Sequence, residues 1–188
     1  MNQMAEEIKK AVPEAQVYVE MLDRIGALII NIVGELVIER KEVGDIEELI
    51  NKIDKFVKKI VKFSSPPYLR KILWSKKAGG IRVGILLEWR VRVRAGCGDR
   101  WWSMVEYLEL DIRYEVGEVI SGGSIYGEYL INPKLKEDTK EEEGLSWLAY
   151  LKYQKTVKIE AMFETAEELL SKWEEFKKRV LETARSSN

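Results

Sequence analysis

The chain has 188 residues, of which 46% are hydrophobic and 34% are charged, and its 31 Lys and Arg nearly balance its 32 Asp and Glu. This composition is typical of a globular protein and excludes a disordered or fibrous chain. The length suits a single domain over 1–188, or two halves, 1–63 and 64–188, that share a core.

Several kinds of catalytic site are excluded by the residues that are missing. The chain has no His and only one Cys, so it cannot build a Ser–His–Asp or Cys–His nucleophile or a His-ligated metal site. The single Cys97 lies in a stretch, 95–100, where we expect a hairpin turn. No glycine-rich phosphate-binding motif occurs either. We therefore expect a non-catalytic protein without a cofactor or a metal ion.

The composition also bears on habitat and location. The chain has 26 Glu and 20 Lys but only 3 Gln and 5 Asn, a balance typical of hyperthermophile, archaeal-like proteins. No apolar run approaches the roughly 18 residues of a membrane span, and the first ten residues lack the pattern of a signal peptide. One Cys permits no internal disulfide, so we expect a cytoplasmic protein.

In chain order, a short helix is predicted over 3–12 and ends near Pro13. The next stretch, 14–43, fits two interpretations. It could be one long helix with a polar face, or three strands, 16–22, 27–33 and 36–43, with turns at 23–26 and at Gly34-Glu35. Its many β-branched residues favour the strands.

An internal comparison supports the strand interpretation. Shifted by 120 residues, segment 37–61 aligns with 157–181, with seven identities that include Glu48 with Glu168. In the later copy an alternating strand precedes a capping box of Thr165 and Glu168. Asp45 and Glu48 occupy the same positions in the first copy. The match predicts a repeated β-α unit, although two amphipathic helices of similar composition would also match.

The remaining helices are expected over 46–63, 67–77 and 165–185. The fold class is therefore α+β: a curved antiparallel sheet with two long amphipathic helices, 46–63 and 165–185, packed on one face. The order of elements over 35–188 is similar to that of helix-grip ligand-binding domains, although no specific motif is shared.

The segments 81–96 and 101–116 alternate between apolar and polar residues and predict a two-stranded ribbon. With a loop at 95–100, Arg94 would lie opposite Trp101, Arg92 opposite Ser103, and Arg90 opposite Val105. One charge, Glu106, falls on the core side and has no explanation in the sequence.

The charge along the chain is strongly polarised. Segment 64–104 carries nine basic and two acidic residues, a net +7, whereas 105–148 carries a net −7. A row of Arg beside exposed aromatic residues is typical of surfaces that bind single-stranded DNA or RNA, because Arg contacts phosphates and aromatic rings stack on bases. The residues expected to bind nucleic acid are Arg82, Arg90, Arg92, Arg94, Arg100, Trp101, Tyr107, Lys76 and Lys77.

Other interpretations of the ribbon stay open at this stage. The Arg side chains could pair with Glu109, Asp111 or the acidic segment on a solvated surface. The two oppositely charged patches could join subunits of a homo-oligomer or hold another protein, which would make the chain a scaffold. A third alternative is a small molecule in a helix-grip-like cavity between the sheet and the last helix.

Overall fold

The computed structural model describes residues 2–22, 27–63, 77–78, 81–82, 84–97, 105–117, 121–132 and 154–187. Its main feature is a six-stranded sheet in the order β1-β2-β5-β6-β7-β8. These strands are β1 (Ala15–Leu22), β2 (Ala27–Glu39), β5 (Gly84–Cys97), β6 (Glu106–Val116), β7 (Ser121–Ile131) and β8 (Lys155–Phe163). Every neighbouring pair is antiparallel except β2 and β5, which are parallel. The predicted α+β class with a mostly antiparallel sheet is confirmed.

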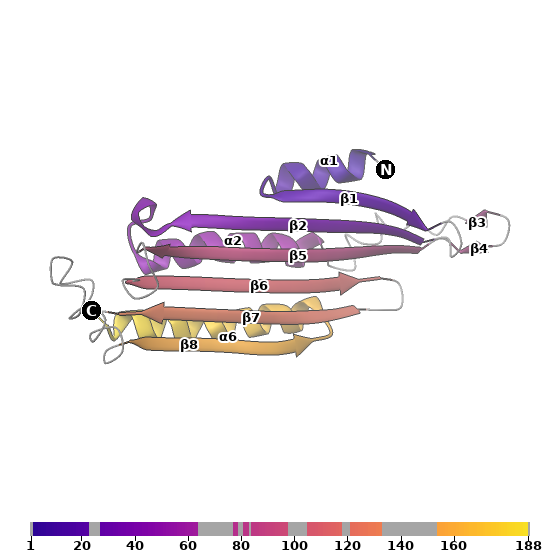
Figure 1. Ribbon diagram of the computed structural model, residues 1–188. Coiled ribbons are helices and arrows are strands. Elements are labelled where there is room, and N and C mark those ends of the chain that lie inside the picture. Colours follow the sequence, from indigo (N-terminus) through magenta and orange to yellow (C-terminus); the bar gives the residue numbers. More distant parts are fainter. Residues whose placement is uncertain are drawn as a thin grey trace.

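Three helices formed by the described residues pack against this sheet (Figure 1). They are α1 (Asn2–Ala11), α2 (Ile46–Phe63) and α6 (Ala166–Arg185), and a short 3-10 helix, η1 (Arg40–Glu42), precedes α2. α1 lies beside β1 at one edge of the sheet, whereas α2 and α6 lie side by side on one of its faces. None of the helices in these described ranges is both long and apolar enough to cross a membrane.

The stretch 14–43 forms two strands and not three. β2 runs without interruption through Gly34, so the expected turn at Gly34-Glu35 is wrong. A Cβ atom at Gly34 would lie 3.3 Å from the Cα of Ala15 and 3.3 Å from the carbonyl oxygen of Glu14. The glycine therefore permits the close approach of β1 to β2, and no chain reversal occurs there.

Both main helices begin with the predicted capping box. At α6 the Glu168 amide donates to Thr165 Oγ1 (3.1 Å), and the Glu168 carboxylate accepts from the Glu164 amide (2.8 Å). At α2 the Glu48 amide donates to Asp45 Oδ1 (2.8 Å), and its carboxylate accepts from the Gly44 amide (2.7 Å). In each case two amides without a helical partner are satisfied reciprocally.

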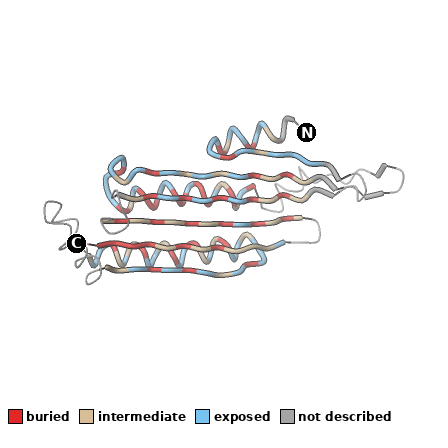
Figure 2. Tube along the Cα trace, viewed as in Figure 1, coloured by how far each residue is buried: buried red, intermediate tan, exposed pale blue. Residues whose placement is uncertain are grey.

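The core lies between the sheet and the two main helices. Buried and outward residues alternate along the strands (Figure 2). Trp89 and Trp173 are both fully buried. A Cβ atom at Gly127 would lie 2.9 Å from the ring of Phe176, so α6 packs directly on the backbone of β7 at this point.

A polar cluster joins α2 to α6 within this layer. Asp54 of α2 is almost fully buried and accepts hydrogen bonds from Trp173 Nε1 (2.9 Å) and Lys177 Nζ (3.2 Å) of α6. Lys58 Nζ lies 2.7 Å from its other oxygen. The carboxylate is therefore paired on both sides, as a buried charge requires.

The ribbon of β5 and β6 has the predicted faces but a different register. Leu87, Trp89, Val91 and Val93 are buried, and Arg90, Arg92 and Arg94 are exposed, as expected. The register differs because β5 continues to Cys97, which pairs with Glu106, the first residue of β6. The expected turn at 95–100 is therefore wrong over 95–97.

Two further expectations fall in the neighbouring segment. Ile81 and Arg82 form β4 (Ile81–Arg82), which pairs with β3 (Lys77–Ala78) in a separate two-stranded sheet. The strand expected over 81–96 is thus divided. The helix expected over 67–77 lies outside the described residues, except that Lys77 begins β3.

Candidate functional site

The sheet face opposite α2 and α6, called here the open face, carries no other described element (Figure 1). The strand register shows which residues share it. The open face includes Gln16, Tyr18, Val33, Glu35, Val37, Glu88, Arg90, Arg92, Arg94, Tyr107, Glu109, Asp111, Arg113, Glu115, Ser124, Tyr126, Glu128, Lys158, Glu160 and Met162.

The structure brings together only part of the predicted nucleic-acid site. Arg90, Arg92, Arg94 and Tyr107 share the open face. Lys77 and Arg82 are cross-strand partners in the small β3–β4 sheet and do not belong to the Arg row. The other three expected contacts lie outside the described residues: Lys76, Arg100 and Trp101.

Carboxylates from neighbouring strands surround the Arg row. Arg92 lies opposite Asp111 in the register, and its Nε donates to Asp111 Oδ1 at 2.7 Å. This contact raises the pKa of Arg92 further. Arg94 Nε lies 3.4 Å from a Glu35 oxygen. The pairing of Arg92 with Asp111, one of the alternatives considered from the sequence, is thus observed.

Two tyrosines on the open face are fixed by acidic neighbours. Tyr107 donates to Glu109 (3.0 Å), and burial together with this hydrogen bond raises its pKa to about 12. Tyr126 donates to Glu128 (2.7 Å), and this hydrogen bond together with burial raises its pKa to about 12. Both hydroxyls therefore stay neutral at physiological pH, and their rings are held in place.

The open face is hollowed in its middle. A depression of about 690 Å³ reaches from β1 to β7, within the roughly 300–1,000 Å³ range of small-molecule sites. Its lining includes Val33, Arg90, Arg92, Asp111, Arg113, Ser124 and Tyr126.

Arg113 also lines the hollow, although it was not among the residues expected to bind nucleic acid. It lies directly opposite Arg90, whereas the predicted register placed Val105 there. The signal that could have revealed it is charge pairing, because the observed register sets Arg92 against Asp111 and Arg94 against Glu109.

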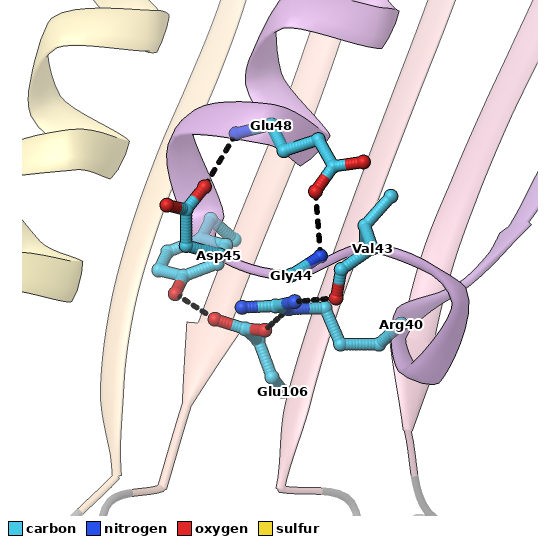
Figure 3. A network of polar contacts seen from close by, with 7 residues as sticks. Arg40, Val43, Gly44, Asp45, Glu48 and Glu106 are labelled. Carbon is cyan, nitrogen blue, oxygen red and sulfur yellow. Dashed lines mark hydrogen bonds and ion pairs between the residues drawn. The ribbon is translucent and has the colours of Figure 1, made fainter.

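Glu106, the buried charge at the start of β6, is explained by a group of polar contacts with neighbouring elements (Figure 3). Its carboxylate accepts from Arg40 Nε of η1 and, at 2.5 Å, from the hydroxyl of Tyr129 on β7. Arg40 also donates to the carbonyl oxygen of Val43 at 3.0 Å. Both oxygens of Glu106 thus have partners, and the group ties the start of α2 to the sheet.

Within the described ranges, no three His, Cys, Asp or Glu side chains are arranged to hold a metal ion. No protein-family model, no curated protein and no solved structure matches the chain.

Proposed function

We propose that the protein is a non-catalytic binding protein that holds its ligand on the open face. The observation that carries this proposal is the asymmetry of the sheet. Two helices cover one face, whereas the hollowed opposite face presents Arg, Tyr, Val and Met side chains. Of the ligand classes considered, single-stranded nucleic acid is the most specific candidate.

The arrangement of Arg90, Arg92 and Arg94 supports this ligand. Their side chains are about half exposed, Tyr107 lies on the neighbouring strand β6, and Tyr126 lines the same hollow as Arg90 and Arg92. Arg can contact phosphates while aromatic rings stack on bases. Because exposed ion pairs stabilise a protein by only about 0–1 kcal/mol, a phosphate can replace a carboxylate partner at small cost.

The carboxylates on the open face limit how long such a ligand can be. Acidic residues outnumber basic ones among its described members, and they are most frequent on β6. A polyanion is repelled there. We therefore infer a short contact of two to four phosphates along β5.

The test is fluorescence anisotropy with labelled single-stranded DNA and RNA at 50 and 200 mM salt. Two to four released counterions predict an affinity loss of about 7- to 50-fold between these salts, from a slope of about −0.7 per phosphate. Binding that is independent of salt, or no binding at 50 mM, would contradict the nucleic-acid proposal.

A second candidate, self-association through the same face, is favoured by its exposed apolar residues. Val33, Val37 and Met162 are 42%, 62% and 77% exposed. Six strands spaced about 4.8 Å apart and averaging 11 residues in length span roughly 24 by 36 Å. That area of about 900 Å² matches the roughly 800 Å² that each partner contributes to a standard interface. Sedimentation velocity at the same two salts distinguishes a dimer from the monomer.

We also infer that two copies of one β-α unit form the scaffold of the open face. β2 with α2 and β8 with α6 each join a strand to a helix through the same reciprocal cap. Three strands separate β2 from β8, which run in opposite directions. We place the protein in the cytoplasm, because its single Cys permits no internal disulfide.

A further inference from the structure

Two positive charges face each other in the hollow of the open face. Arg90 of β5 and Arg113 of β6 are direct cross-strand partners, so their Cα atoms lie only about 5 Å apart. Like charges in directly opposite positions destabilise a sheet. Such a pair is therefore a position where a bound anion would stabilise the protein.

The carboxylates nearest to these two residues neutralise them only loosely. Arg90 Nη2 lies 3.8 Å from Glu88, and Arg113 Nη2 lies 3.4 Å from Glu115, compared with 2.7 Å for Arg92 and Asp111. Glu88 and Glu115 lie opposite each other, two residues away from Arg90 and Arg113 along the strands, and they do not line the hollow. Both Arg residues line the hollow, and their side chains are 51% and 61% exposed.

Two of the three acidic residues that line the hollow contact other Arg residues. Asp111 lies 2.7 Å from Arg92 and Glu35 lies 3.4 Å from Arg94, and the third is Glu14. Asp111 or Glu35 therefore has to leave an existing partner before it can reach Arg90 or Arg113.

The same row across the sheet supplies further contacts. Ser124 of β7 lies opposite Arg113, and Val33 of β2 lies beside Arg90. A phosphate between the two Arg residues would thus have a hydroxyl donor on one side and an apolar surface on the other. Tyr126 also lines the hollow and offers a ring for the rest of the ligand.

We propose that Arg90 and Arg113 form a phosphate-binding site at the floor of the hollow, with Ser124 as an additional donor. The planar guanidinium group suits this role, because it binds phosphate through two parallel hydrogen bonds. The inference rests on the proposed function, since it names the anchoring point on the same face. The shared chemistry is a phosphate group, from a small phosphorylated molecule or from a nucleic-acid backbone.

The test is titration calorimetry with inorganic phosphate at low salt. Removing one charged hydrogen-bond donor, by Arg90→Gln or Arg113→Gln, is expected to raise the Kd at least about tenfold. Arg185→Gln is the matched control, because this α6 residue is 62% exposed, like Arg113 at 61%, but does not line the hollow. Equal phosphate binding by all four proteins, or none by the wild type, would overturn the site. Thermal unfolding verifies that each variant is folded.

A second arm uses a labelled ten-residue oligothymidylate and separates the two sources of phosphate. If the oligonucleotide binds, is displaced by inorganic phosphate, and binds more weakly to both Arg variants, then the site accepts a phosphate of the nucleic-acid backbone. If the oligonucleotide binds but neither Arg variant weakens it relative to Arg185→Gln, the phosphate site is wrong and the proposed function stands. If only inorganic phosphate binds, and it depends on both Arg residues, the site holds and the nucleic-acid proposal fails.

Discussion

Glu106 shows what a single charged residue on an apolar strand face predicts about the structure. Its position on the core side of β6 contradicts the hydrophobic pattern around it, and the pattern alone offers no partner. The structure supplies Arg40, 66 residues earlier in the chain, and Tyr129. A buried charge in an otherwise regular strand therefore predicts that a partner exists, but not which residue it is.

Asp54 leads to a prediction about stability in acid. Burial alone would raise the pKa of its carboxyl, but the hydrogen bonds from Lys58, Trp173 and Lys177 outweigh burial and lower the pKa below 3.8. A lowered pKa means that the folded state binds this proton less readily than the unfolded state. The contribution to stability is thus fully present above about pH 4 and is lost as the pH falls through the folded pKa.

We expect Asp54→Asn to reduce the dependence of the unfolding free energy on pH below about pH 4. The measurement is urea denaturation at a series of pH values between 2 and 7. Glu174→Gln is the control, because this exposed residue contacts Lys177 from the solvent side. An acid dependence that is identical in the Asp54 variant and the wild type would show that the carboxylate does not titrate as described.

At the scale of elements, the capping boxes were predictable because the signal is local. A cap requires only an oxygen-bearing side chain and a Glu three residues later, so Thr165 and Asp45 could be identified from the sequence. We expect Thr165→Ala and Asp45→Ala each to lower the unfolding free energy by about 1 kcal/mol. Ser171→Ala, in the exposed interior of α6, should be neutral or slightly stabilising. Equal effects of all three substitutions, measured by chemical denaturation, would contradict the assigned caps.

The register of β5 and β6 was not predictable from alternation. The observed pairing of Arg90 with Arg113 differs from the predicted pairing with Val105 by eight residues. Because the side chains of a strand alternate with a period of two, any even shift leaves every residue on the same face. The faces of the ribbon were therefore correct while its cross-strand partners were wrong.

Gly34 illustrates a signal with two physical meanings. A Gly-X pair between β-branched segments predicts a two-residue turn, but a glycine is equally required where two backbones approach closely. Here the second explanation applies, because the carbonyl of Glu14 and the Cα of Ala15 lie close to Gly34 and leave little room for a side chain. Ala15 begins β1 and Glu14 directly precedes it, so the sequence around Gly34 carried no information about either residue.

For the whole molecule, the amphipathic strands predicted a sheet with one buried and one polar face. The parallel pairing of β2 with β5 was not predictable, because 44 residues separate the end of one strand from the start of the next. This pairing places Val33 beside Arg90 and Glu35 beside Arg92. The open face is thus a product of long-range topology as much as of local pattern.

The central claim is that the open face is the binding surface, and two valines test it most directly. Val33 is 42% exposed on the open face, whereas Val19 is 40% exposed and points to the opposite side, since it pairs with the buried Ile30. The measurement is the affinity for single-stranded oligonucleotide by anisotropy in Val33→Glu and Val19→Glu. A carboxylate beside a bound phosphate costs on the order of 1.4 kcal/mol, so Val33→Glu should weaken binding about tenfold. Val19→Glu should bind like the wild type. Equal affinity of the two variants would contradict the assignment of the open face.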